Sequence, residues 1–240
     1  MRPVDKGVWP ESNKGKKYVF NDWKRAKKHL VLRTGDFCHL CEVRVNNALS
    51  VEHIKSRDSH PRLSGSWHNF LLACSSCNSS KKNAVLLLPY RERYYWPHLN
   101  NTMLVFYTPL IGHGAMVVNA GTALSVEQKV KAQATIDLYG LGKLKTSTGD
   151  SDNRFTERLE TVDMAIELLR DYTNNDTNIG SILKVAVSRG FFSIWVDIFS
   201  SKPEVVTALI DSPKFKIDRA VCFDANLQPI HRNPLKADPV

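Results

Sequence analysis

The sequence predicts an α+β protein in which a zinc-stapled core of two strands and one helix follows a basic N-terminal arm and precedes a mainly α-helical half. Two cysteine pairs, each with a two-residue spacer, predict the zinc staple. From residue 123 onward the apolar residues recur at a helical period. We therefore expect an arm and helix over residues 1–35, a core domain with a following β segment over 36–122, and a helical scaffold or partner-docking region over 123–240.

The N-terminal arm is rich in proline and glycine and is expected to be flexible at first. Trp23, Ala26 and Leu30 then stand at helical spacing and predict a short basic helix that ends at Gly35. Its cations could form a phosphate-binding face or simply a solvated one. They are Lys24, Arg25, Lys27 and Lys28.

The core is expected to hold a first strand over 48–54, a second extended piece over 67–72, and a helix that opens at the second cysteine pair. So small a unit buries little area by itself, and bound zinc would supply much of its folding free energy. After it, 103–108 and 115–119 predict two strands joined by a turn over 112–114. The aromatic and basic run 90–96 could cover a core edge or stack on bases.

Four helices are expected in the C-terminal half. Ser125 with Gln128 predicts a capping box at the first, whose apolar face would contain Val126, Val130, Ala134, Leu138 and Leu141. A second follows Asp152, with an apolar face at Phe155, Leu159, Val162, Ile166 and Leu169. A third is expected over 179–199, a fourth from Pro203 to about Ile210, and an irregular tail over 226–240.

Cys38, Cys41, Cys74 and Cys77 predict one closed Zn²⁺ site, since a two-residue spacer lets consecutive thiolates converge on one ion. Four sulfur ligands leave no open position, so this zinc is expected to be structural. Cys222 is expected to be a buried apolar residue. This use of cysteine fits a reducing compartment better than a disulfide framework, and no apolar run is long enough to cross a membrane. We expect a cytoplasmic protein without a membrane partner.

The basic charge is concentrated around the cysteines. Residues 1–96 contain 18 lysines and arginines against 8 acidic residues, a net charge of +10, whereas the rest of the chain has a net charge of −1. A basic domain around a candidate active site indicates a polyanionic substrate such as nucleic acid, although a solubilising face is the alternative.

Residues between and just after the cysteine pairs could hydrolyse a phosphodiester. His53 has the intrinsic pKa of a base at neutral pH, and Asn69 is expected to fix the orientation of its imidazole. Glu52 and Asn78 offer the oxygen ligands that a catalytic Mg²⁺ or Mn²⁺ prefers. The residues expected to contact substrate phosphate are Lys81, Lys82, Arg57 and Arg62. The histidines expected to lie at the surface or in loops are His39, His60 and His68.

In order, these motifs are Cys-x2-Cys, Glu-His-Ile, Trp-His-Asn-Phe and Cys-x2-Cys-Asn-x2-Lys, and together they resemble the HNH endonuclease family with its ββα-metal fold. The resemblance implies that His53 is the general base and that Asn69 is the middle asparagine. It places Asn78 where a histidine is often found, as in the His-Asn-Asn variant, and Glu52 where aspartate is more usual. Glu52 and Asn78 would then hold one catalytic metal ion.

The basic start, the tryptophan before the middle motif and the helical half further resemble the PtuB group, the HNH effectors of Septu and retron anti-phage systems. That resemblance implies an ABC/SMC-like ATPase partner (PtuA-type) and, in retrons, a reverse transcriptase with its msDNA. The substrate would be DNA or RNA, including tRNA, and the sequence does not discriminate between them. Two alternatives are a non-catalytic zinc-ribbon nucleic-acid-binding subunit and an adaptor that docks an ATPase.

Overall fold

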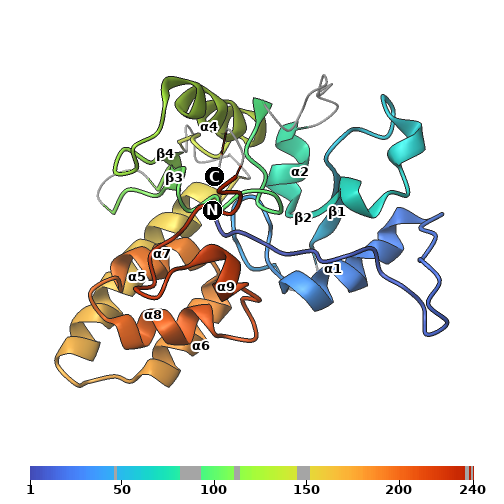
Figure 1. Ribbon diagram of the computed structural model, residues 1–240. Coiled ribbons are helices and arrows are strands. Elements are labelled where there is room, and N and C mark those ends of the chain that lie inside the picture. The colour runs from blue at the N-terminus through green and yellow to red at the C-terminus, as the bar shows by residue number, and fades with distance from the viewer. Residues whose placement is uncertain (46–47, 82–92, 111–113, 145–151, 236–237, 239) are drawn as a thin grey trace.

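The computed structural model describes the chain except residues 46–47, 82–92, 111–113, 145–151, 236–237 and 239. The protein is α+β, with two antiparallel two-stranded sheets among the described residues. Figure 1 shows the helices α5 to α9 on one side, the strands β1 and β2 with α1 and α2 on the other, and both termini between them. Each side has its own hydrophobic cluster, so the chain has two adjoining cores.

The predicted strand–strand–helix arrangement is present, with shorter elements. Strands β1 (Ser50–His53) and β2 (Phe70–Ala73) are antiparallel, with His53 opposite Phe70, and the helix α2 (Ser75–Lys81) follows directly. Phe70 to Ala73 are all buried, because β2 pairs with β1 along one edge and also contacts α1 and α2. The 3-10 helices η2 (Pro61–Leu63) and η3 (Trp67–Asn69) shape the loop between the strands.

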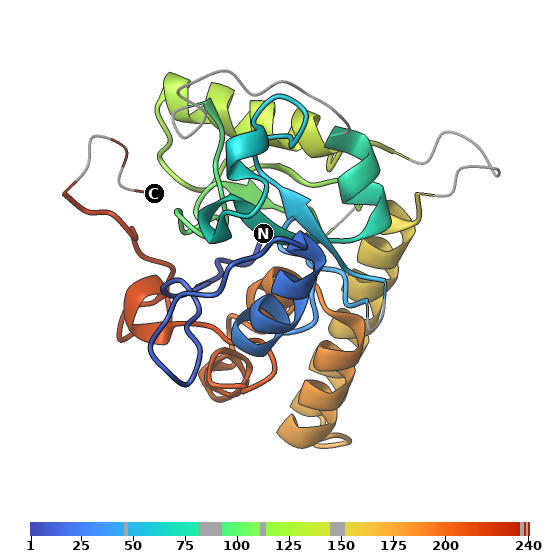
Figure 2. The same cartoon turned by 90° about the vertical axis from the view of Figure 1, so that its right-hand side faces the viewer.

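The basic helix forms as expected. The segment before it was expected to be flexible but is instead packed against the core. The 3-10 helix η1 (Trp23–Arg25) leads into α1 (Ala26–Thr34), which ends at Gly35. Arg2 is only 1% exposed and donates to the carbonyl oxygens of Thr34 (2.9 Å) and Phe215. Lys6 Nζ donates to three carbonyl oxygens around the start of β2. Buried cations that find carbonyl acceptors hold the segment in place, and Figure 2 faces the side where it lies with α1.

The middle of the chain contributes the strands β3 (Phe106–Tyr107) and β4 (Val117–Val118) and the helix α4 (Val126–Tyr139). The Ser125–Gln128 capping box is present, and Gly140 ends the helix in the left-handed conformation. The expected apolar face is correct only at its C-terminal end: Leu141 is buried and Leu138 packs against the core, whereas Val126 is 74% exposed and Val130 is 65% exposed. The buried residues within α4 are Ala132, Thr135, Ile136 and Tyr139.

The helical half differs from expectation at one sharp corner. The predicted helix over 179–199 is two helices, α6 (Ile179–Arg189) and α7 (Phe192–Ile198), separated by Gly190 and by Phe191 at φ 53°. A Cβ on Gly190 would lie 2.5 Å from the carbonyl oxygen of Glu42, so the corner needs glycine to approach the first cysteine loop. The break therefore docks the helical half onto the loop of the first cysteine pair.

The remaining helices are α5 (Arg154–Thr173), α8 (Pro203–Ile210) and the short α9 (Arg219–Cys222), and the described part of the tail is irregular. Cys222 is buried, as expected. Tyr95 and Trp96 are fully buried, so within this run they cover the core and do not offer their rings to bases. Predictions for Lys82, residues 84–91 and the turn at 112–113 lie outside the described residues. No helix in the described part combines the length and apolar character that crossing a membrane requires.

Candidate metal centre and candidate active site

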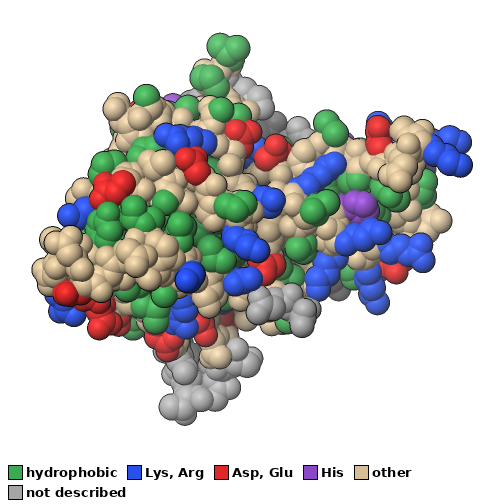
Figure 3. Space-filling model, turned by 90° about the horizontal axis from the view of Figure 1, so that it is seen from below, with side chains coloured by type: hydrophobic (Ala, Val, Ile, Leu, Met, Phe, Trp, Pro, Cys, Tyr) green, Lys and Arg blue, Asp and Glu red, His purple; other side chains and the backbone are tan. Residues whose placement is uncertain are grey.

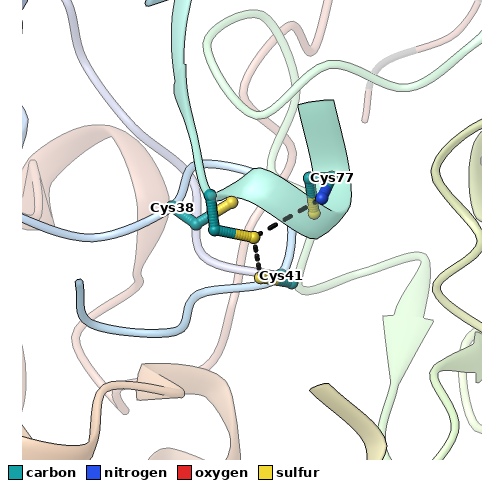
Figure 4. A group of neighbouring side chains, drawn as sticks. Cys38, Cys41 and Cys77 are labelled. Atoms are coloured by element: carbon teal, nitrogen blue, oxygen red, sulfur yellow. Dashed lines mark hydrogen bonds between the residues drawn. The ribbon is translucent and has the colours of Figure 1, made fainter. Parts of the chain in front are cut away.

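The four cysteines of the two pairs converge as the spacing predicts. Their sulfur atoms all lie within 4.8 Å of one another, and every one of these residues is buried. The sulfurs of Cys41 and Cys74 are 3.6 Å apart, close to the edge of about 3.8 Å of a tetrahedron with Zn–S bonds of about 2.3 Å. Figure 4 shows Cys38, Cys41 and Cys77 turned toward one another at the start of α2. This donor set fits a structural zinc ion.

Two buried arginines of α5 stand behind the cysteine cluster. Arg154 Nη1 donates to the Cys77 sulfur at 3.1 Å and to the carbonyl oxygen of Tyr139 at 2.8 Å. Burial opposes its charge, but the bonds with Asp152 raise the pKa of Arg154. Arg158, which is 1% exposed, donates to the carbonyl oxygens of Gly114 and Leu141. A zinc ion with four thiolates carries a net charge of −2, which these two guanidinium groups can offset.

Sequence reasoning missed these arginines. They stand one turn apart on the same face of α5 as Val162 and Ala165. Charged residues are rarely fully buried without a partner, so two arginines in an otherwise apolar stripe were a signal that a buried anion lies opposite. The helical half is therefore electrostatically tied to the cysteine cluster.

A separate pocket of about 130 Å³ opens beside the cluster, on the other side of α2. It brings together five of the predicted site residues, Glu52, His53, Arg57, Asn78 and Lys81. The other lining residues are Trp23, Val51, Ser56 and Asp58. Strand β1 supplies Glu52 and His53 and helix α2 supplies Asn78 and Lys81, so the close approach of these two elements builds the pocket.

His53 is fixed by aromatic rings and by one backbone carbonyl. Its imidazole makes edge contacts with Trp23 and Phe70, at ring-centre distances of 5.3 and 5.2 Å. Nε2 lies 3.0 Å from the carbonyl oxygen of Ser64, so Nε2 carries the proton of the neutral ring and Nδ1 keeps its lone pair. Burial, with Arg57 and Lys81 nearby, lowers the pKa of His53. The neutral, proton-accepting form therefore predominates at pH 7.

Glu52 and Lys81 form a buried ion pair in the pocket wall. Lys81 Nζ lies 2.6 Å from Glu52 Oε1 and also donates to the carbonyl oxygen of His53. Burial raises the pKa of the Glu52 carboxyl, while the Lys81 ammonium acts in the opposite direction. Lys81 was expected to hold a phosphate. Since it is only 3% exposed, it instead holds Glu52 and the end of β1.

Asn78 and Asn69 have different roles in the structure. Asn78 is exposed, and its amide donates to the Ser50 hydroxyl at 3.3 Å, which leaves its carbonyl oxygen as the atom offered to a cation. Asn69 does not contact the imidazole of His53, contrary to expectation. It accepts from the Lys55 amide at 2.8 Å and donates to the carbonyl oxygens of Lys55 and Leu63. It therefore clamps the loop whose Ser64 carbonyl holds His53.

The two predicted arginines lie in different places. Arg57 lines the pocket and lies over the ring of Trp23, with its guanidinium carbon 5.0 Å from the ring centre. Arg62 is exposed and lines a second, neighbouring pocket. His68 is exposed, as expected, and His60 is half-buried. His39 was expected at the surface but is 1% exposed, because it bonds Thr34 Oγ1 (2.7 Å) and accepts from the Leu72 amide (3.2 Å).

Sequence reasoning missed Trp23 and Asp58, which line the pocket, and the Ser64 carbonyl, which holds His53. Trp23 was recognised only as a helix residue, and a backbone carbonyl leaves no signal in a sequence. A scan of protein-family models finds no match to this chain, and no curated protein matches it. The residues of the two sites are therefore what indicates the function.

Proposed function

We propose that this protein is a metal-dependent nuclease of the HNH type, with the ββα-metal unit formed by β1, β2 and α2. The observation that carries the proposal is His53, whose base form has its Nε2 tied to Ser64 in a pocket that also contains Glu52 and Asn78. A base beside oxygen ligands is the combination that phosphodiester hydrolysis needs.

In the proposed mechanism His53 Nδ1 accepts a proton from a water molecule as that water attacks the phosphorus and the bond from phosphorus to the leaving oxygen breaks. The leaving oxygen takes a proton from solvent, and His53 returns its proton to solvent. The Ser64 carbonyl stabilises the imidazolium that forms, because it accepts from the Nε2 proton. Glu52 and Asn78 would hold Mg²⁺ or Mn²⁺, which supplies charge stabilisation at the phosphate. Arg57, exposed at the pocket rim, would hold a phosphate oxygen of the bound strand.

The proposed context is that of a toxic effector in a Septu or retron anti-phage system, acting on DNA or RNA, including tRNA. The motif order of residues 38–81 and the helical half support it. The partners would be an ABC/SMC-like ATPase and, in a retron, a reverse transcriptase with its msDNA. The exposed apolar stripe of Val126 and Val130 on α4 is available for such a partner.

The test compares wild type with His53→Ala in cleavage of plasmid DNA, total RNA and a tRNA pool. Removal of a general base is expected to slow cleavage by about 10²- to 10⁴-fold. His231→Ala, in the exposed tail, is the matched control and should cleave like wild type. Each protein is assayed without divalent ions, then with Mg²⁺ or Mn²⁺ added, and zinc content is measured beforehand.

The loss of cleavage in His53→Ala counts as evidence for the proposal only if this variant has the same zinc content and melting temperature as wild type. The pool that disappears in the wild-type reaction identifies the substrate class. An inactive wild type is assayed again with the ATPase partner. If wild type and His53→Ala then remain equal in every pool, the nuclease proposal is wrong, and the zinc-ribbon binding module replaces it.

A further inference from the structure

We propose that the second pocket, next to the candidate active site, binds an unpaired nucleotide that flanks the scissile phosphate, so that the substrate enters as a single strand. The inference rests on the nuclease function proposed above. It concerns a surface, here named the aromatic groove, that borders the His53 pocket at Ser64 and otherwise consists of residues without a role in the proposed mechanism. The groove is lined by Trp9, Lys17, Tyr18, Val19, Phe20, Asn21 and residues 62–66.

The aromatic groove has the chemistry of a base-binding surface. Trp9 and Tyr18 are half-buried and line the groove, and the exposed cations Lys17 and Arg62 also line it. Aromatic rings stack on bases of any sequence, while cations hold the backbone beside them. A base can stack on a side chain in this way only when it has left its own duplex. The lining therefore favours a single strand.

The groove and the active site share a wall. Ser64 lines the groove with its neighbours, and its carbonyl oxygen also holds His53 Nε2 at 3.0 Å. Asn69 fixes the same loop through the carbonyl oxygen of Leu63. A nucleotide seated on residues 62–66 would thus lie directly behind the general base. This position fits a nucleotide next to the one whose phosphate is attacked.

The two pockets differ in size, so each fits a different part of a nucleotide. The His53 pocket, at about 130 Å³, falls below the range of about 300–1,000 Å³ in which small molecules are usually held. It suits an ion and a phosphate group. The aromatic groove, at about 710 Å³, is within that range and can take a base with its sugar.

The surroundings of the groove match the charge of a strand. Residues 11 and 17 pair as a short hairpin whose exposed lysines stand beside the groove. The exposed cations of this hairpin and of the following basic helix are Lys14, Lys16, Lys17, Lys24, Arg25 and Lys28. Figure 3 shows Lys and Arg side chains gathered on the right-hand part of this face, the side of α1 and the N-terminal segment. A strand leaving the groove would meet this basic surface.

The experiment measures binding without cleavage, in the His53→Ala background and without Mg²⁺. The probes are a fluorescent 12-nucleotide single strand of mixed sequence, as DNA and as RNA, and the duplex of each. Tyr18→Ala should weaken single-strand binding by roughly tenfold and duplex binding less than twofold. The fold should survive, because Trp9 Nε1 donates to the backbone carbonyl of Tyr18. Arg62→Ala should reduce the salt dependence of binding by about one phosphate contact.

Tyr172→Ala and Arg219→Ala are the matched controls, a half-buried tyrosine and an exposed arginine in the helical half. Neither should change binding of either probe. Equal loss of single-strand and duplex binding in Tyr18→Ala would overturn the inference, and so would unchanged binding in both groove variants. Cleavage by the wild type is scored separately, so a failed groove leaves the nuclease proposal intact. Conversely, if the groove binds single strands but the wild type cleaves none of the nucleic acids, the groove is a binding site and the nuclease proposal fails.

Discussion

Cys77 and Asn78 are neighbours in α2, yet they belong to two very different environments. Cys77 is 0% exposed and points into the cysteine cluster, where Arg154 donates to its sulfur. Asn78 is exposed and lines the His53 pocket. Successive residues of a helix point about 100° apart, so one short helix can serve a closed metal site and an open pocket at once. The cysteine cluster and the proposed catalytic site therefore lie on different faces of the same unit.

The largest effect is expected from a substitution in the buried cysteine cluster. Cys41→Ser removes one of four buried sulfur ligands and is expected to abolish zinc binding and unfold the β1–β2–α2 unit. The binding free energy of structural zinc, about 10–16 kcal/mol in small zinc domains, is comparable to the whole stability of a domain. Zinc content by mass spectrometry and thermal melting by circular dichroism measure both effects.

Cys222→Ser is the matched control, because Cys222 is equally buried but lies in α9, outside the cysteine cluster. The variant should keep one equivalent of zinc. Its free energy of unfolding should fall by only about 1–2 kcal/mol, as is usual for substitutions of buried residues that do not bind metal. A Cys41→Ser protein that kept its zinc and its melting temperature would show that the cluster does not staple the fold.

The buried Glu52–Lys81 ion pair in the pocket wall should give the next largest effect. Lys81→Met leaves the Glu52 carboxylate buried without its partner, and breaking a buried pair in this way costs about 3–5 kcal/mol. The melting temperature should fall by about 6–20 °C for a chain of this size. Lys184→Met, at an exposed site on α6, should change it by no more than about 2 °C.

The double variant Glu52→Gln with Lys81→Met sharpens this result. It removes both charges, so at least half of the lost melting temperature should return, even though the proposed metal ligand is gone. If the double variant melts as low as Lys81→Met alone, the loss comes from packing of the lysine stem and not from the stranded charge.

The cysteine cluster was predictable from the sequence, whereas the hydrogen bonds around the His53 pocket were not. A Cys-x2-Cys spacer fixes which atoms meet, because short-range geometry alone brings the two sulfurs together. Asn69 shows the limit of such reasoning. Its position in the motif was recognised, but its bonds to Lys55 and Leu63 depend on the path of a loop with two 3-10 turns. Motif spacing therefore identifies which residues belong to such a site, but it does not predict which groups they hydrogen-bond.

The helical half was predictable in its elements and less so in its faces. The capping box at Ser125 is local and formed as expected. The buried face of α4 depends on its contacts with α2 and β4, and it contains Ala132 and Ile136 while Val126 and Val130 stay exposed. The break at Gly190 likewise follows from a contact with the distant residues 42–44. Tertiary contacts of this kind override a helical period.

The smallest predicted effect concerns the open face alone. Burial and the nearby cations lower the pKa of His53, so its neutral form is lost only when the pH falls below the usual range for histidine. Cleavage that needs this base should be constant above that range and decline on the acid side. Arg57→Gln removes one of the cations, makes the imidazolium less unfavourable, and should move the acid limb to higher pH. The titration of the His53 ring by NMR, assigned with His53→Ala, measures the shift without any need for activity.

Arg62→Gln is the matched control, because it removes a positive charge from the same loop but from the wall of the aromatic groove. It should leave the titration of His53 unchanged, and neither substitution should alter zinc content or melting by more than surface changes usually do. A shift of equal size in both variants would mean that His53 responds to the general charge of the domain. In that case the pocket is not electrostatically distinct from the surface around it, and the division between a closed and an open face would have to be redrawn.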